Sequence, residues 1–408
     1  MIVALKNKKL VSTITNIEYP FERIEEFAEN GESLEVRIDG IEKARVRKGK
    51  FLWERFADFM PFSKIDESIS LGEGNTALLK ADKKLLDFVD LNNLYLKNET
   101  QNPTWSFKDR GSLACIAMSK EMGETTTATI STGNMGNSIS AYGAKAGIKV
   151  IVFVPEFTPK EKIMAIGIHG AVVMKIVAPD YSDMKKKVLS LAEKLNLRIV
   201  SGNGPVRVEG YKTTSFEMFE QMNGKVPDYI AVPTSACGHI RGIFKGYKEL
   251  RQAGIINKTP KMIVVQAHNN SPIVSAIKEG KRQVVPFSNF HTLAEAITTG
   301  NPMGGDEIID KANKYAWLAE DVTEDEIVES QKRLAESGYF VEPASATSLY
   351  AIKKLRAAGK IEKDACVVMI LTGSGLKDPE VLKYHKANIS EVLLKEVEGM
   401  LTSYIKSI

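Results

Sequence analysis

Residues 102–112 read NPTWSFKDRGS and lie between a predicted strand and a predicted helix. A lysine in such a loop is ordinarily solvated, but the neighbours of Lys108 differ from those of a surface lysine. Trp105 and Phe107 supply apolar bulk, and Arg110 supplies a positive charge. Desolvation and a nearby cation both lower the pKa of an amine and favour its neutral form, which attacks aldehydes. The stretch therefore makes Lys108 a candidate reactive amine, with a solvated lysine as the alternative.

Short apolar strands alternate with amphipathic helices on both sides of this stretch. The segments at residues 182–196 and 323–338 have the periodicity of helices with a polar outer face. Several strand candidates are apolar on both faces, as in strands that helices cover from both sides. This alternation predicts an α/β protein with parallel sheets. The strand candidates are residues 93–99, 127–133, 149–155, 171–177, 197–203, 229–235, 261–267 and 366–373.

The first 60 or so residues have a different pattern. Residues 33–40, SLEVRIDG, and residues 44–51, ARVRKGKF, alternate between apolar and polar side chains. Alternation of this kind is typical of short antiparallel strands with one face exposed. We therefore expect a small β-containing extension before the α/β part of the chain.

Composition excludes several classes of protein. The chain has 408 residues, of which 43% are hydrophobic and 26% charged, and its formal charge is only +4. This balance gives no reason to expect a nucleic-acid partner, and no apolar run approaches the roughly 18 residues of a membrane span. The beginning of the sequence lacks the pattern of a secretory signal. Three scattered cysteines without a CxxC pair indicate reduced thiols, so we expect a cytoplasmic protein.

Four of the predicted strands run into loops of small residues. These loops are residues 131–134, 201–204, 234–239 and 371–375. In parallel sheets, ligands bind where loops leave the carboxyl ends of the strands. The four loops are therefore expected to surround one ligand site.

The loop at residues 235–239 has the properties of a phosphate site. Small side chains let a ligand approach the backbone N–H groups, and helical sequence follows directly. No GxxxxGK[ST] motif is present, so the loop is not of the P-loop type. A plain tight turn is the alternative interpretation.

The motifs together resemble a known family. Residues 106–111, SFKDRG, resemble the lysine motif of fold-type II pyridoxal-phosphate enzymes, the tryptophan synthase β family. Residues 71–76, LGEGNT, resemble the SLGEGNTPL signature of the threonine synthases, with Ala77 in place of proline. Further matching blocks follow in family order between about residues 50 and 385. They are residues 131–134, 153–155, 245–247, 342–346 and 371–379.

The resemblance implies a role for each matching residue. Lys108 would bind pyridoxal 5'-phosphate as a Schiff base and then move protons. A hydroxyl beside the pyridine nitrogen would favour elimination and replacement over transamination. The other implied contacts are Asn134 to the phenolic oxygen, Thr372 to the pyridine nitrogen, Ser235, Ala236, Cys237, Gly238 and His239 to the cofactor phosphate, Ser131, Thr132 and Gly133 to the substrate carboxylate, and Arg207 to a substrate phosphate.

The resemblance also implies an architecture of two open, twisted, mainly parallel-sheet domains. Residues 61–109 and 206–385 would form a large cofactor-binding domain, and residues 110–205 a small mobile domain. Residues 1–60 would be the β-containing extension and residues 386–408 a helical tail. Relatives suggest a homodimer, and no metal is implied.

Four positions depart from the usual threonine synthase pattern. They are Trp105, Met135, His239 and Ser374, which stand where glycine, a small residue, asparagine and histidine are common. Changed contacts in a side-chain pocket are worth roughly 1–3 kcal/mol each. The leading expectation is conversion of O-phosphohomoserine and water to threonine and phosphate. The alternatives are a cysteate synthase acting on phosphoserine, an ammonia-lyase or thiolase-type relative acting on a diamino or oxo-amino acid, and a degenerate homologue that only binds a small anion.

Overall fold

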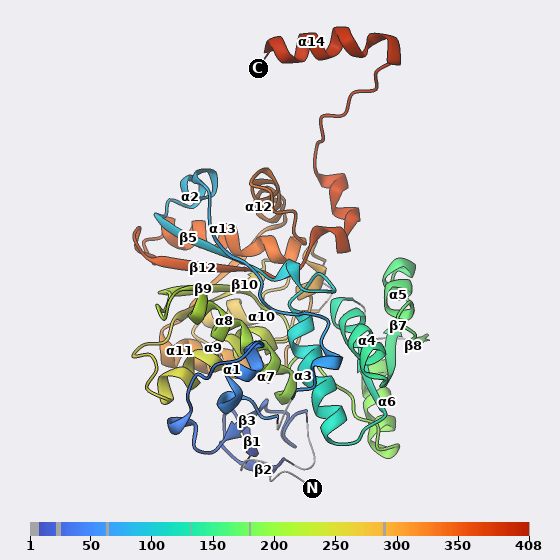
Figure 1. Ribbon diagram of the computed structural model, residues 1–408, viewed down its shortest axis with the longest axis vertical. Coiled ribbons are helices and arrows are strands. Elements are labelled where there is room, and N and C mark those ends of the chain that lie inside the picture. The colour runs from blue at the N-terminus through green and yellow to red at the C-terminus, as the bar shows by residue number, and fades with distance from the viewer. Residues whose placement is uncertain are drawn as a thin grey trace.

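The computed structural model describes residues 8–21, 26–62, 65–131, 133–178, 181–288 and 291–407. Three sheets organise these residues, and helices lie between and around them (Figure 1). The α/β class predicted from the sequence is confirmed. The predicted site residue Thr132 lies outside the described residues.

The largest sheet has six strands in the order β11-β10-β9-β12-β5-β4. All neighbours are parallel except β4, which pairs antiparallel with β5 at one edge. Along β9, Ile230 and Val232 point into one apolar core, and Tyr229 and Ala231 point into another. Both faces are therefore buried, as predicted. The strands are β4 (Leu78–Lys80), β5 (Asn93–Asn98), β9 (Tyr229–Pro233), β10 (Lys261–Ala267), β11 (Leu318–Val322) and β12 (Cys366–Leu371).

Helices cover both faces of this sheet. On one face α13 packs against β9, β10 and β12 and contacts α2 and α12, whereas on the other face α9 packs against β9 and β10 and contacts α7 and α8. The helices concerned are α2 (Lys83–Val89), α3 (Lys108–Glu121), α7 (Pro205–Tyr211), α8 (Thr213–Gln221), α9 (Gly238–Gln252), α10 (Pro272–Lys278), α11 (Gly305–Tyr315), α12 (Glu324–Glu336) and α13 (Pro343–Ala357).

A second, three-stranded parallel sheet has the order β6-β7-β8. Its strands are β6 (Thr126–Ile130), β7 (Lys149–Pro155) and β8 (Val172–Ile176), and its helices are α4 (Asn134–Ala146), α5 (Lys160–Gly167) and α6 (Tyr181–Lys194). The strand predicted at residues 197–203 is reduced to one bridge, in which Ile199 pairs with Ala128. Beyond this bridge the chain leaves the sheet and enters α7.

The N-terminal residues form the expected antiparallel sheet, in the order β2-β1-β3. Its strands are β1 (Lys8–Ser12), β2 (Glu18–Pro20) and β3 (Leu34–Ile38), followed by the short helix α1 (Leu52–Arg55). The strand predicted at residues 44–51 is wrong. This segment pairs with no strand, because the Arg47 N–H bonds instead to the Arg55 carbonyl beside α1.

Helix α3 begins at Lys108, inside the stretch at residues 102–112 that the sequence places before the predicted helix. The Asp109 carboxylate accepts hydrogen bonds from the N–H and hydroxyl of Thr104, at 2.6 and 2.5 Å. These bonds tie the first helical turn to the preceding turn, where Trp105 has a positive φ of 62°. The Lys108 side chain therefore projects from the first residue of α3.

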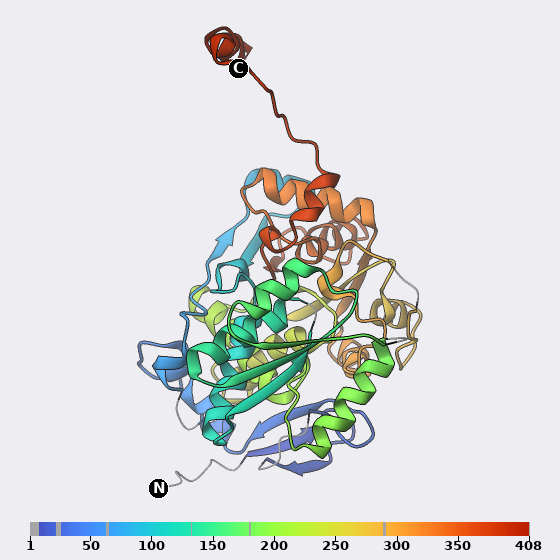
Figure 2. The ribbon, with the colours of Figure 1, turned by 90° about the vertical axis from the view of Figure 1, so that its right-hand side faces the viewer.

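The chain ends in a helix that stands apart from the rest of the molecule. Helix α14 (Val397–Ser407) projects beyond the end of the body opposite the N-terminal sheet (Figures 1 and 2). The predicted helical tail therefore forms a helix within residues 386–407. Among the helices that the structure describes, none is long and apolar enough to cross a bilayer.

Candidate active site

The four loops predicted to surround a ligand site meet at one cleft. Its empty volume is about 500 Å³. The cleft lies at the carboxyl ends of β9 and β12 and receives residues from the start of α3 and of α4. Its lining includes Phe107, Lys108, Asn134, Gly202, residues 234–240, Glu342, Ala344 and Thr372.

Lys108 has the perturbed amine that its neighbourhood predicts. Its pKa is lowered to about 7, mainly by burial and also by the Arg207 charge, while Glu342 opposes the change. The Nζ atom lies 4.4 Å from the centre of the Phe107 ring. A substantial fraction of Lys108 is therefore neutral near pH 7, which is the state required of a nucleophile or base.

The cause of this shift differs in part from the sequence-based prediction. Arg110 does not act on Lys108, because its buried guanidinium is paired with Glu99 at 2.6 Å and Glu217 at 2.7 Å. Trp105 is 52% exposed and supplies little burial. The cation is Arg207, which comes from α7. Only tertiary structure brings that helix against α3.

The loop at residues 235–239 connects β9 to the N-terminus of α9. Cys237 caps this helix with a positive φ of 73°. A side chain at Gly238 would collide with the Gly202 carbonyl, so glycine lets the two loops approach closely. The first N–H groups of a helix have no partner within the helix and bind anions readily. Together with the small residues Ser235 and Ala236, the loop has the geometry of a phosphate site.

His239 lies in the first turn of α9, where its ring stacks on Phe107. The ring centroids are 3.7 Å apart and the planes differ by 10°. Burial lowers the pKa of His239 to about 3, so the ring is neutral. Among the described residues neither ring nitrogen has a hydrogen-bond partner. The ring therefore acts as an uncharged wall between the phosphate loop and the start of α3.

Asn134 and Glu342 join the two sheet regions across the cleft. The Asn134 side-chain nitrogen donates to both carboxylate oxygens of Glu342, at 2.8 and 3.0 Å. Burial raises the pKa of Glu342, and the bond from Asn134 opposes the rise. A side chain at Gly373 would collide with this carboxylate.

Glu342 directly precedes α13, a position at which a side chain commonly caps a helix. Its side chain makes no cap bond to α13. It braces Asn134 instead, from a position 208 residues away in the chain. The local sequence signal, a glutamate before a proline at a helix start, does not reveal this partner.

The remaining predicted residues occupy different places around the cleft. The Ser131 hydroxyl accepts the Gly136 N–H at 2.9 Å, which fixes the turn into α4. The Gly133 N–H lies in the same turn, 3.4 Å from that hydroxyl. Thr372 lines the cleft, and its carbonyl accepts the Phe107 N–H at 3.0 Å.

Arg207 does not line the cleft. It is buried behind the start of α3, and its Nη1 donates to the Ser112 hydroxyl at 3.3 Å. Burial opposes its charge, but the neighbouring Tyr211 helps to raise the pKa of Arg207, so the guanidinium stays positive. The guanidinium reaches Lys108 through its charge rather than through a contact.

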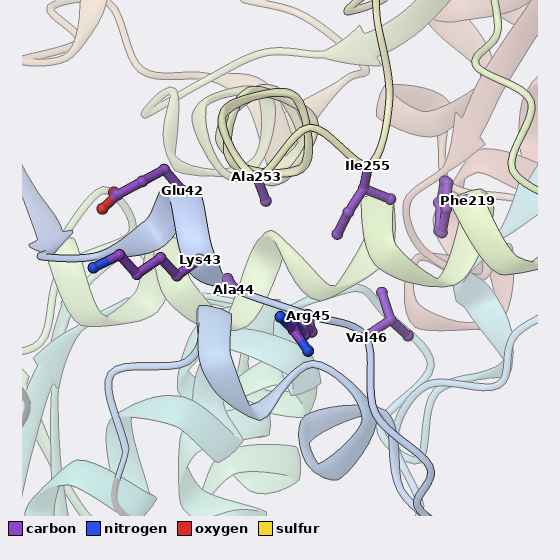
Figure 3. A pocket seen from close by; sticks show the side chains of 8 residues that line it. All are labelled: Glu42, Lys43, Ala44, Arg45, Val46, Phe219, Ala253 and Ile255. Carbon is purple, nitrogen blue, oxygen red and sulfur yellow. The ribbon is translucent and has the colours of Figure 1, made fainter.

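A second hollow lies away from these residues, between the segment at residues 42–46 and the end of α9. Figure 3 shows Val46 and Ile255 facing each other across it, with Phe219 beside them. Its charged lining residues are exposed on the surface, and none of the predicted site residues lines it. Within the described part of the chain, no group of three or more His, Cys, Asp or Glu side chains could hold a metal ion.

Comparison with known proteins identifies the family. Residues 69–373 match the model of the pyridoxal-phosphate dependent enzymes. The threonine synthase of Methanocaldococcus jannaschii is 38% identical over 344 residues, which cover 84% of both chains. That of Methanosarcina acetivorans is also 38% identical, over 85% of this chain and 84% of its own.

Solved structures show the same fold. A serine racemase from Dictyostelium discoideum superimposes with a TM-score of 0.62 at 26% identity, covering 74% of this chain and 92% of its own. The threonine deaminase isoform 2 of Solanum lycopersicum gives 0.65 at 20% identity, covering 84% and 89%. The chain thus belongs to the pyridoxal-phosphate-dependent enzymes of fold type II, as a threonine synthase-like member whose cofactor is pyridoxal 5'-phosphate.

Proposed function

We propose that this enzyme converts O-phosphohomoserine and water to threonine and inorganic phosphate. The observation that carries the proposal is the partly neutral Lys108 amine facing the N-terminus of α9, in a chain 38% identical to threonine synthases. The enzyme would act in the cytoplasm as a homodimer.

The residues of the cleft fit the cofactor. Lys108 supplies the amine, and the loop at residues 235–239 supplies N–H groups for the phosphate. Thr372 would face the pyridine nitrogen. The Asn134 amide carries two hydrogens, so it can donate to Glu342 and to the phenolic oxygen together. When bound, the cofactor would stabilise negative charge beside the Cα atom of the amino acid.

Lys108 would move the protons of the reaction. Its pKa of about 7 lets the neutral amine accept a proton from the substrate Cα and return one later. A further proton leaves Cβ as phosphate departs from Cγ. Cγ then gains a proton and becomes the methyl group, and the oxygen of a water molecule adds at Cβ. The buried surroundings of the amine keep bulk water away while these transfers occur.

Two groups would bind the anionic ends of the substrate. Gly133 lies at the N-terminus of α4, where helix N–H groups attract a carboxylate. Arg207 would stabilise the departing phosphate through its buried positive charge. This role requires the substrate or α3 to move, because Arg207 lies behind that helix.

Met135 supports a second candidate function. Its sulfur lies 3.7 Å from the point where a Cβ atom would stand if Gly202 had a side chain, and Gly202 lines the cleft. A methionine here narrows the space beyond the cofactor and favours a shorter substrate such as O-phosphoserine. The reaction would then be a β-replacement, as in a cysteate synthase. An ammonia-lyase or thiolase-type reaction on a diamino or oxo-amino acid is the other alternative.

One assay separates these reactions. The enzyme loaded with cofactor is incubated with O-phosphohomoserine and O-phosphoserine in parallel, and released phosphate and amino-acid products are measured. Threonine from O-phosphohomoserine supports the proposal. A loaded enzyme that leaves O-phosphohomoserine unchanged contradicts it, and turnover of O-phosphoserine with a sulfur nucleophile identifies the alternative.

A further inference from the structure

The loop at residues 201–204 is the segment by which the chain leaves the three-stranded sheet. It follows the bridge between Ile199 and Ala128 and ends at Gly204, which precedes α7. Gly202 lines the Lys108 cleft, and α7 carries Arg207. The conformation of this loop therefore sets the positions of both.

The N-terminal extension holds this loop through three contacts. The Ser201 N–H donates to the Glu26 carboxylate at 2.8 Å. The Asn203 amide donates to the Ser33 hydroxyl at 2.9 Å. Arg241 joins the two parts, since it donates to the Asn203 carbonyl and to the carbonyl of residue 34, both at 2.8 Å. The N-terminal extension therefore contacts the loop at residues 201–204, which borders the cleft.

Glu26 differs from the other two contacts because it is the one that brings a carboxylate to the loop. Burial raises its pKa, whereas the bonds from Ser201 and the charges of Arg198 and Arg207 lower it. The charge of Arg207, which the proposed reaction uses, therefore also acts on this carboxylate. A side chain at Gly204 would collide with this carboxylate, so glycine provides the space that Glu26 fills.

We propose that Glu26 is a positioning residue, whose carboxylate accepts the Ser201 N–H and thereby holds the 201–204 loop and Arg207 ready for an anionic amino-acid substrate. This inference rests on the proposed function. Glu26 touches neither the cleft lining nor Lys108, so it acts through the loop. Without it the loop would have to be ordered by the substrate, and part of the binding energy would be lost.

The test compares three variants of the cofactor-loaded enzyme. Glu26→Ala removes the acceptor and is expected to raise KM for O-phosphohomoserine by roughly tenfold or more, with a smaller change in kcat. Glu26→Gln keeps an amide oxygen that accepts the Ser201 N–H, so it should restore most of the loss. Glu29→Ala is the control, because Glu29 is exposed in the same segment.

Hydrogen exchange measures the order of the loop at residues 201–204 directly, so this second test does not depend on catalytic activity. In Glu26→Ala, the peptide covering residues 199–211 should exchange faster than in the wild type, whereas peptides of β12 should not change. If the wild type is inactive towards O-phosphohomoserine, the proposed function fails but this exchange result still tests the role of Glu26. Unchanged exchange in Glu26→Ala overturns the inference. A Glu26→Gln variant as impaired as Glu26→Ala overturns it as well, because the hydrogen bond would then not be the cause.

Discussion

At the scale of single residues, the site depends on an amine that is costly to protonate. Lys108 is half-buried in the cleft beside Phe107 and lies within range of the Arg207 charge. The positive form of the amine lacks hydration there, and a second positive charge lies nearby. Both effects favour the neutral amine, which has the reactivity that the proposed chemistry requires.

The first prediction concerns covalent attachment of the cofactor. Lys108→Ala should abolish the link that borohydride traps and lower turnover by several orders of magnitude, because no other amine is expected to replace it. Peptide mapping of the reduced wild-type enzyme measures the site of attachment. Reduced cofactor on a different lysine would end the assignment.

The second prediction concerns stability of the cofactor-free protein. The pKa of Lys108 falls from its ordinary value of 10.5 to about 7 on folding. Between these two values the unfolded chain binds more protons, so stability rises with pH across this window. Lys108→Met should therefore be more stable than the wild type by a few kcal/mol at pH 7 and below, and the difference should shrink towards pH 10.5. Urea unfolding at several pH values measures it, and a difference independent of pH would contradict the assigned shift.

The third prediction concerns Arg207. A charge-assisted contact to the substrate phosphate is worth roughly 1.5–3 kcal/mol, so Arg207→Ala should lose about 10–150-fold in kcat/KM for O-phosphohomoserine. The cofactor should stay bound, because the loop at residues 235–239 holds its phosphate separately. Absorbance of the bound cofactor is the control measurement. Unchanged kcat/KM would mean that Arg207 only tunes its surroundings.

At the scale of elements, the phosphate site is produced by the contact of two loops. The N-terminus of α9 can approach residue 202 only because Gly238 has no side chain. The helix itself is held by apolar residues such as Ile243 and Phe244 in the core below the sheet. The position of its free N–H groups is therefore a consequence of core packing.

The fourth prediction tests this contact. Gly238→Ala would force α9 away from the Gly202 carbonyl and should weaken cofactor binding by at least tenfold, since a steric clash with backbone costs typically 1–3 kcal/mol. Gly399→Ala is the matched control, because that helical glycine has no atom within 4 Å of an added side chain. Equilibrium dialysis measures cofactor affinity. If both variants bound the cofactor with equal affinity, the close approach of Gly238 to the Gly202 carbonyl would not be needed for cofactor binding.

At the scale of the whole molecule, the cleft lies between the large sheet and the three-stranded sheet. The contact between Asn134 and Glu342 crosses this cleft and links its two sides. We propose that residues 110–205 form a small domain which closes over the substrate, around the loop that Glu26 holds.

The fifth prediction follows from this closure. Binding of a substrate analogue should reduce the radius of gyration in solution scattering and slow hydrogen exchange at residues 131–134, because closure excludes water from the cleft. Glu342→Gln weakens the bond to Asn134 and should change the exchange rate of the free enzyme. Identical profiles with and without the analogue would count against domain closure.

The sequence alone determined the features that depend on local pattern. Strand and helix periods predicted the α/β class, and the SFKDRG stretch made Lys108 a candidate reactive amine. The small-residue loops at the ends of strands predicted one shared site, which the structure contains. These features follow from residues adjacent in the chain, so neighbours in sequence are sufficient to recognise them.

Only the tertiary structure decided which distant groups meet. In the folded chain the cation near Lys108 is Arg207 and not Arg110. Asn134 donates to Glu342, and the Ser201 N–H donates to Glu26. The tertiary structure also left residues 44–51 unpaired and made an edge strand of the charged segment Leu318–Val322. The physical reason is that pKa shifts and hydrogen bonds depend on distance in space, and this distance is set by the packing of helices on the sheets.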